Sequence, residues 1–180
     1  MENITLHSFF IANINENYLN YLYKIDNKVP KEHANSKKRP FIGVVFNIND
    51  ILYFVPLTSP KPKFKKLHNK IDFYKLKNGE LGAINFNNMI PVTKELVKVY
   101  NINNEQDQKY KRLIIEQQFF LLRRQNEIRK KAYRLYEKYI NNKLDAGTKS
   151  RCCDFKLLEN KLNDYSLIWL RFLLLTTHYF

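Results

Sequence analysis

The sequence has few cysteines and lacks the motifs of the common hydrolases. Its two cysteines, Cys152 and Cys153, are adjacent, which excludes both a disulfide framework and a zinc pair of the C-x-x-C kind. There is no cluster of His, Asp and Glu at metal-ligand spacing, no glycine-rich phosphate loop and no G-x-S-x-G elbow. We therefore interpret the cysteines as structural thiols of a reducing compartment, and we disfavour a two-metal nuclease.

A targeting signal and a membrane span are also missing from the sequence pattern. The N-terminal "MENITLHSFF" has no basic segment followed by an apolar stretch and a small-residue cleavage site. The most apolar stretch, "YSLIWLRFLLLTT" from Tyr165, is interrupted by Arg171 and falls short of the ~20 apolar residues that cross a bilayer. We expect a cytoplasmic protein with no membrane partner, in which this stretch forms a buried or partner-covered helix.

Acidic residues are outnumbered by basic ones. Lys and Arg number 31 against 17 Asp and Glu, which gives a formal charge of +14 and a pI of about 9.7. A charge of this size favours partners that carry phosphates, and the 12 Tyr and 13 Phe fit base stacking as well as core packing. Nucleic acid is therefore the partner that we expect first.

The first 104 residues carry the patterns of a small antiparallel sheet. Strand-forming residues fill "FIGVVFNI" and "ILYFVPL", and Asn49 and Asp50 between them predict a tight hairpin. Because Pro56 has no N–H for a ladder, we expect the second strand to become an edge or to break there. A helix capped by Asn15 is predicted after the first strand. The remaining strands are predicted at residues 4–12, 72–76, 81–86, 89–92 and 96–100.

Residues 105–180 carry a helical pattern instead. From Glu105 to Lys143 apolar residues recur every three, four, seven or eight positions, and so long a span predicts a break or bend. A further helix capped by Asp154 is predicted from "CDFKLLENKL". The length of 180 residues favours one α+β domain over 1–180, with a sheet-rich part at 1–104 and a long basic helical part at 105–180.

Two hydroxyls and a lysine follow the end of the second hairpin strand, in "LTSPK". Without a metal, RNA is cleaved by attack of its own 2′-hydroxyl, and the protein must align this nucleophile, relay a proton and stabilise charge on the phosphorane. Thr58 and Ser59 suit hydrogen bonds to phosphate oxygens, and Lys61 supplies charge in a loop that the neighbouring prolines stiffen. Antiparallel pairing of the hairpin places Arg39, a potential bidentate phosphate ligand, at the same end as Thr58.

Each of these features also has a structural interpretation. The sequence T-S-P-K after a strand is an ordinary turn with a polar cap. His33 and His68 suit acid–base catalysis, yet loop histidines of a basic protein are more often exposed bystanders. Asn85 and Asn87 make turns as readily as they read bases, and the basic helix faces are solvated as readily as they follow a phosphate backbone.

Several segments together indicate a family. In chain order, "YLNYLYKIDNKVP", "RPFIGVVF", "YFVPLTSPKPK", "GAINFNNMIPV", "YKRLIIEQQFF" and "CDFKLLENKL" resemble the ToxN/AbiQ family, the endoribonuclease toxins of type III toxin–antitoxin systems. The resemblance covers residues 18–163. It implies a compact, strongly twisted antiparallel sheet flanked by helices, similar to the Kid/MazF toxins. It further implies an RNase without metal or cofactor, which cuts adenine-rich RNA and leaves a 2′,3′-cyclic phosphate and a 5′-hydroxyl.

The resemblance also implies the partners. They are cellular and phage RNA as substrates, and a small repeat-derived RNA antitoxin that folds as a pseudoknot. The toxin cuts this RNA to unit length and is then inhibited by it inside a closed protein–RNA hetero-oligomer. Such pairs resemble abortive-infection systems that defend against phage.

Carried over by position, the resemblance places the catalytic hydroxyls and lysine at Thr58, Ser59 and Lys61, and the basic residue before the next strand at Arg39. Because arginine stays protonated, Arg39 is expected to bind charge rather than transfer a proton. The family tyrosine that opens the first helix falls on Tyr18, and His33 is the nearest replacement for a loop tyrosine of the family. The RNA contacts that we expect are Tyr18, Tyr21, His33, Lys37, Lys38, Lys63, Lys65, Lys66, Asn85, Asn87, Arg112, Arg123 and Arg124.

Two other functions stay open at this point. One is a basic RNA-binding module of a ribonucleoprotein that has no catalytic activity. The other is a toxin of the same sheet architecture that grips a protein target such as a topoisomerase, since a fold does not fix a function. The charge of +14 is poorly explained by a protein target.

Overall fold

The computed structural model describes residues 9–31 and 40–176, with side chains up to residue 167. The predictions that concern residues 1–8, 32–39 and 177–180 lie outside the described residues. The elements in chain order are β1 (Phe10–Ile14), α1 (Glu16–Ile25), β2 (Phe41–Ile48), β3 (Ile51–Thr58), α2 (Pro62–Lys66), β4 (Phe73–Lys75), η1 (Lys77–Gly79), β5 (Ala83–Asn85), η2 (Phe86–Asn88), β6 (Ile90–Val92), η3 (Lys94–Leu96), β7 (Val97–Val99), η4 (Ile102–Asn104), α3 (Gln108–Ile140), α4 (Ala146–Arg151) and α5 (Phe155–Thr176).

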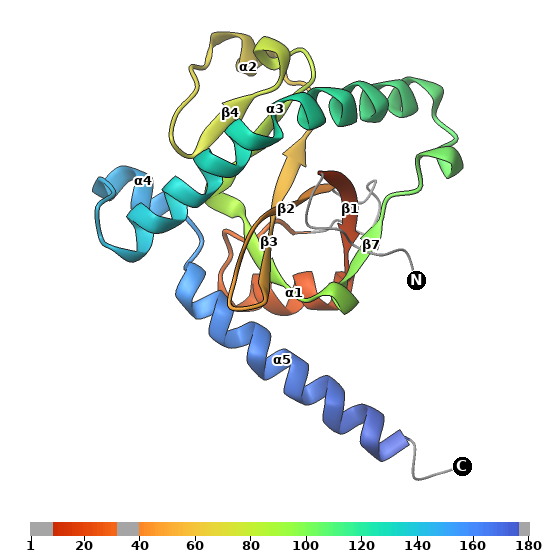
Figure 1. Ribbon diagram of the computed structural model, residues 1–180, viewed down its shortest axis with the longest axis vertical. Coiled ribbons are helices and arrows are strands. Elements are labelled where there is room, and N and C mark those ends of the chain that lie inside the picture. Colours follow the sequence, from red (N-terminus) through yellow and green to blue (C-terminus); the bar gives the residue numbers. More distant parts are fainter. Residues whose placement is uncertain (1–8, 32–39, 177–180) are drawn as a thin grey trace.

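The strands form one antiparallel sheet. Within the described chain it has seven strands in the order β4-β5-β3-β2-β1-β7, and β6 also pairs with β3. Figure 1 shows α3 and α1 at opposite ends of the sheet, while the second half of α5 extends beyond the rest of the protein. The prediction of an α+β fold with an antiparallel sheet flanked by helices is confirmed.

The β2–β3 hairpin forms as predicted, but β3 does not end at Pro56. Asn49 and Asp50 adopt positive φ angles of 48° and 65°, as a tight hairpin turn requires. The N–H of Leu57 donates to the Pro40 carbonyl on the β2 side, so position 56 faces the opposite side of the strand. On that side the partner changes from β6, which pairs with 52–54, to β5, which pairs with 57–58. The expected break at Pro56 is absent, because β3 continues to Thr58. The missing N–H falls between the two partners, where β3 has no paired residue on that side.

The predicted helices begin at their predicted caps. The side chain of Asn15 accepts from the Tyr18 amide at 3.0 Å, and that of Asp154 accepts from the Leu157 amide at 3.1 Å. The prediction of a break or bend between Glu105 and Lys143 is met by a bend: α3 is a single helix of 33 residues, and its axis changes direction along its length in Figure 1.

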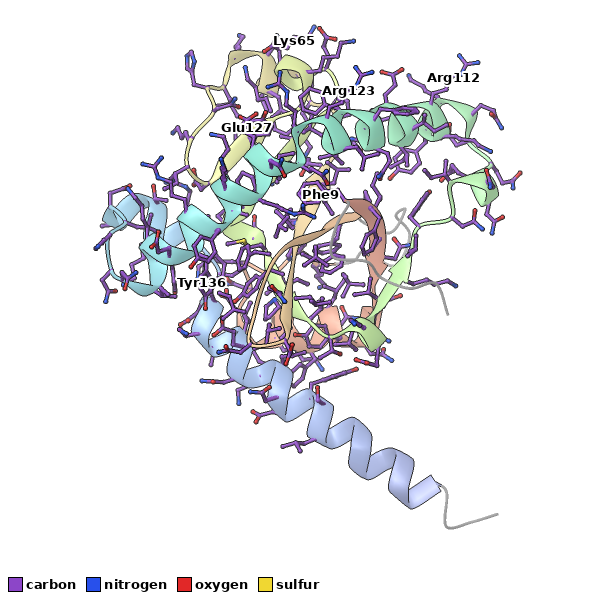
Figure 2. All side chains as sticks on the ribbon, in the orientation of Figure 1. Phe9, Lys65, Arg112, Arg123, Glu127 and Tyr136 are labelled. Atoms are coloured by element: carbon purple, nitrogen blue, oxygen red, sulfur yellow. The ribbon has the colours of Figure 1, made fainter. Side chains whose placement is uncertain are left out.

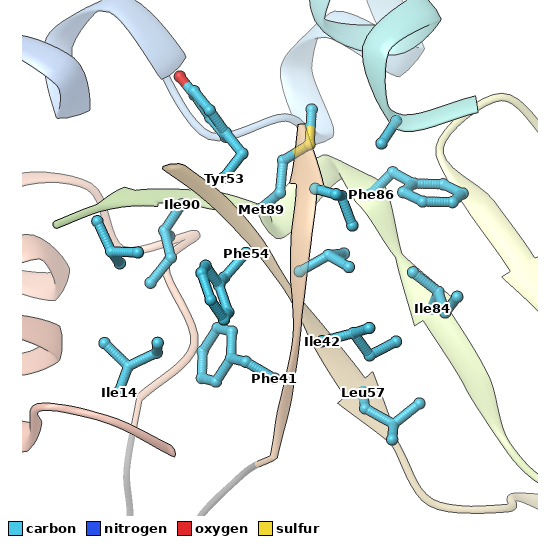
Figure 3. Packing of buried hydrophobic residues seen from close by; sticks show 14 of the residues in the cluster. Ile14, Phe41, Ile42, Tyr53, Phe54, Leu57, Ile84, Phe86, Met89 and Ile90 are labelled. Atoms are coloured by element: carbon cyan, nitrogen blue, oxygen red, sulfur yellow. The ribbon is translucent and has the colours of Figure 1, made fainter. Parts of the chain in front are cut away.

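A single hydrophobic core connects the sheet to the helices. It joins strand residues such as Phe41 and Phe54 to Ile114 and Leu135 of α3 and Leu158 of α5, each 0% exposed. Figure 3 shows Phe41 and Phe54 within this cluster. Because residues of both 1–104 and 105–180 share the core, the packing supports the single-domain interpretation, which stays a prediction.

Two further expectations concern the cysteines and the apolar C-terminal stretch. Cys152 and Cys153 are 1% and 0% exposed, and burial raises the pKa of Cys152 to about 12, as fits structural thiols. In the described part of the chain, no helix has the length and apolarity that crossing a membrane requires. Leu167, near the end of the described side chains, is exposed.

Candidate functional site

The end of β3 brings a buried hydroxyl next to an exposed one. Thr58 is 9% exposed and pairs with Ala83 of β5, whereas Ser59 is exposed. The amide Nδ2 of Asn85 donates to Thr58 Oγ1 at 3.4 Å, a long hydrogen bond. Because the Thr58 oxygen accepts a hydrogen bond from Asn85, the hydroxyl proton of Thr58 can be donated to another partner. Asn85, which the sequence assigned to RNA contact, therefore lies against Thr58.

Two residues that the sequence analysis did not assign hold this strand end in place. Gly82 has a φ of +95°, and a Cβ built there would lie 1.9 Å from the Thr58 carbonyl oxygen, so only glycine permits this approach of the backbone. Gln117 of α3 is 1% exposed, and its Nε2 donates to the neighbouring Leu81 carbonyl at 2.7 Å. No sequence pattern predicts a contact between residues 36 positions apart. The one available signal was a polar residue, Gln117, among the buried apolar positions of α3, because a buried polar side chain needs a hydrogen-bond partner.

Lys61 is the N-cap residue of α2, and further lysines of this helix are exposed to solvent. Pro62 occupies the first turn of this helix, and the buried Phe64 anchors it, with its ring centroid 5.4 Å from that of Phe73. Figure 2 shows Lys65 at the outer edge of the molecule. The exposed lysines of this segment, none of which forms an ion pair within the part of the chain that is described, are Lys61, Lys63, Lys65 and Lys66. They form an anion-attracting surface beside Ser59.

The predicted juxtaposition of Arg39 and Thr58 depends on the start of β2. Phe41 lies opposite Pro56, and the Pro40 carbonyl accepts from the Leu57 N–H at 2.9 Å. Pro40 thus lies at the end of β3 that carries Thr58. The side chains of His33, Lys37, Lys38 and Arg39 lie outside the described residues.

Tyr18 does not offer its ring to RNA in this structure, which corrects the sequence assignment. It is 0% exposed, because α1 turns it toward the sheet, and its hydroxyl donates to the Pro91 carbonyl at 2.8 Å. Burial raises the pKa of Tyr18 well above its ordinary value, so it remains a donor to that carbonyl. Tyr21 is half-buried and its ring centroid lies 5.1 Å from that of Tyr165 on α5. These tyrosines join α1 to α5.

Asn87 also has a structural contact. Its Nδ2 donates to the Arg151 carbonyl at 3.0 Å, which ties η2 to the end of α4. This contact uses one of the two N–H donors of the Asn87 amide and leaves the other donor and Oδ1 for a further partner. The structure thus gives Asn87 a structural contact, and its predicted contact with RNA stays a prediction.

The predicted arginines of α3 are exposed. Figure 2 shows Arg112 and Arg123 on the side of the helix that faces away from the sheet. Arg124 lies 3.5 Å from a Glu127 oxygen, which also accepts from the Tyr74 hydroxyl. Arg112 and Arg123 form no ion pair within the described ranges, so their charge is available to an anionic partner.

Comparisons with known proteins agree with this geometry. Residues 10–163 match the family described as "Toxin ToxN, type III toxin-antitoxin system". The sequence is 34% identical to endoribonuclease ToxN of Pectobacterium atrosepticum over 84% of this chain and 91% of that protein. It is 32% identical to endoribonuclease AbiQ of Lactococcus lactis subsp. lactis over 91% of each.

A solved structure of a type III toxin has a similar fold. This structure, described as selective toxin inhibition by a non-coding RNA pseudoknot in a type III system, superposes with a TM-score of 0.76 at 30% identity, over 88% of this chain and 98% of the other. The family resemblance of the sequence is thus confirmed. The chain belongs to the ToxN family, the toxins of type III toxin–antitoxin systems.

Proposed function

We propose that this chain is an endoribonuclease toxin that cuts adenine-rich RNA without a metal. The observation that carries the proposal is the strand end where Thr58, Ser59 and Lys61 lie next to the lysines of α2, none of which forms an ion pair within the described residues. Relatives that share most of the chain are named endoribonucleases, which supports the same activity here. Thr58, Ser59, Lys61 and Arg39 are the proposed catalytic residues.

The proposed reaction is an internal transesterification. The 2′-oxygen of a ribose attacks the adjacent phosphorus, the bond to the 5′-oxygen breaks, and the products carry a 2′,3′-cyclic phosphate and a 5′-hydroxyl. One proton leaves the 2′-hydroxyl and one is delivered to the departing 5′-oxygen. The protein contributes alignment and stabilisation of the charge that develops on the phosphorane.

Each group of the strand end has a distinct proposed role. Ser59 and Thr58 donate hydrogen bonds to the non-bridging oxygens, and the amide of Asn85 keeps the Thr58 proton available because it occupies the Thr58 oxygen. Lys61 places a positive charge near the phosphorane and is a candidate for proton transfer. Arg39 is proposed to clamp a phosphate from the start of β2.

The proposed partner is a small RNA antitoxin. The pseudoknot RNA described for a solved relative supports a repeat-derived inhibitor that this toxin cuts and then binds in a protein–RNA hetero-oligomer. The lysines of α2 and the exposed arginines of α3 supply the charge for such an RNA. We place this activity in the cytoplasm, where it acts on cellular and phage RNA.

Cleavage of a single-stranded, adenine-rich RNA in the presence of EDTA tests the proposal. We expect cleavage at full rate, because none of the proposed groups needs a metal, with fragments that end in a 2′,3′-cyclic phosphate. Tight binding without any cleavage would favour the RNA-binding module instead. Loss of cleavage in EDTA that returns with Mg²⁺ would contradict the proposed chemistry.

A further inference from the structure

One large aromatic side chain on α3 is exposed to solvent and does not belong to the apolar face that packs on the protein. Phe119 is 62% exposed, although the apolar positions of α3 that pack on the protein, such as Ile114 and Leu121, are 0% exposed. Single exposed apolar residues are common and carry no meaning alone. The surroundings of Phe119 make this one informative.

Phe119 lies within a basic row on the outer face of α3. Positions four and seven residues apart lie on one face of a helix. The members of this outer row, all exposed, are Arg112, Glu116, Phe119, Arg123, Asn126 and Lys130. At 1.5 Å per residue, Arg123 and Arg112 lie about 6 Å and about 10 Å along the axis from Phe119.

The cations of the outer row are not neutralised. Within the described residues neither Arg112, Arg123 nor Lys130 forms an ion pair, and Glu116 contributes the only negative charge of the row. Tyr133, the other exposed large aromatic of α3, differs because its ring packs edge-on against Phe46 at 5.8 Å. Phe119 therefore combines a ring that, among the described residues, stacks on no other aromatic ring with flanking positive charges.

An aromatic ring between arginines matches single-stranded RNA. An unpaired base stacks on a ring whatever its identity, and the phosphates on either side are drawn to the arginines. A base inside a duplex is already stacked on its neighbours and cannot meet the ring. An apolar protein surface would leave Arg112 and Arg123 without partners.

We propose that Phe119 is a base-stacking site for an unpaired nucleotide of a bound RNA, with Arg112 and Arg123 holding the adjacent phosphates. Because the ligand is RNA, this inference rests on the proposed function. The stacked base is not the one at the scissile bond. Gln117, two positions earlier, points to Leu81 beside the Thr58 strand end, and two positions turn a helix by about 200°. Phe119 thus faces away from that site, and the outer row contacts a more distant part of the RNA.

The test uses a fluorescein-labelled, adenine-rich RNA of about twelve nucleotides, within the range that single-strand sites occupy, with 2′-O-methyl sugars so that it cannot be cut. Fluorescence anisotropy compares the affinities of the Phe119→Ala, Phe119→Leu and Phe119→Trp variants with that of the wild type. Alanine and leucine should each weaken binding roughly 5- to 100-fold, because both remove the ring. Tryptophan should keep the affinity, and its emission should be quenched by the RNA beyond the signal of the native Trp169.

An arginine variant tests the phosphate contacts, and a variant of the second exposed aromatic residue of α3 serves as a control. Arg123→Gln should lower the slope of log affinity against log salt by about 0.7, as expected for one single-strand phosphate contact. Tyr133→Leu should bind as the wild type does, because its ring already packs on Phe46. Unchanged thermal midpoints would show that the Phe119 variants fold.

Other outcomes overturn the inference in distinguishable ways. Full affinity of Phe119→Leu together with weak Phe119→Ala would mean an aliphatic contact, as a protein partner makes. If all Phe119 variants bind as the wild type does, and the wild type cuts unmodified RNA, only the stacking site fails. If the wild type neither binds nor cuts RNA, the proposed function fails with it.

Discussion

Replacing Ser59 with alanine is expected to reduce cleavage of an adenine-rich RNA by roughly 10²- to 10³-fold, the usual loss when one donor to a developing oxyanion is removed. Ser59 is exposed, and within the described chain its hydroxyl makes no hydrogen bond, so its loss should leave the fold unchanged. Because the lysines of α2 are retained, affinity for the antitoxin RNA should fall by less than about threefold. Single-turnover cleavage and a binding titration with the same RNA separate these two quantities.

The control for this variant is Ser150→Ala. Ser150 is also exposed, and it donates only to the Gly147 carbonyl within α4. That variant should cut RNA at the rate of the wild type. Cleavage by Ser59→Ala at more than about half the wild-type rate would remove Ser59 from the mechanism that we propose.

Gly82→Ala is expected to destabilise the protein by about 2–5 kcal/mol, which lowers the melting temperature by roughly 5–15 °C. The first cause is the φ of +95°, which side chains rarely adopt. The second is the 1.9 Å between the new Cβ and the Thr58 carbonyl oxygen, which must be relieved by separating β5 from the end of β3. Since Thr58 and Ser59 move with that backbone, molecules that still fold should cut RNA poorly.

A second glycine provides the comparison. Gly147 lies in α4, where a Cβ would meet the Asp145 Oδ1 at 3.3 Å, so Gly147→Ala should change stability by less than about 1 kcal/mol. Thermal unfolding followed by circular dichroism measures both variants. A melting temperature of Gly82→Ala within a degree or two of the wild type would show that the backbone contact at Thr58 does not matter.

Elements with local signals were predictable from the sequence. Asn15 and Asp154 mark helix starts because a cap bonds within its own first turn. The turn at Asn49 and Asp50 likewise depends on a few adjacent residues. The hydroxyls of "LTSPK" follow directly from the end of β3.

Features that depend on distant contacts were not predictable. Continuation of β3 past Pro56 requires the exchange of β6 for β5 along one side of the strand, which no local pattern encodes. The burial of Tyr18 follows from the position of Pro91, 73 residues away. The support that Gln117 gives to Leu81 joins the two halves of the chain. Position in the fold, rather than residue type, decided which of the polar residues lie at the candidate site.

The most direct test of the proposed chemistry compares two adenine-rich RNAs that differ only by a 2′-deoxy sugar at the scissile nucleotide, incubated with the wild-type protein in EDTA. The proposed mechanism predicts that the all-ribose RNA is cut to a 2′,3′-cyclic phosphate and that the substituted RNA binds but stays intact at that bond. Cleavage of both RNAs at similar rates would contradict attack by the 2′-hydroxyl, and with it the roles proposed for Thr58, Ser59 and Lys61.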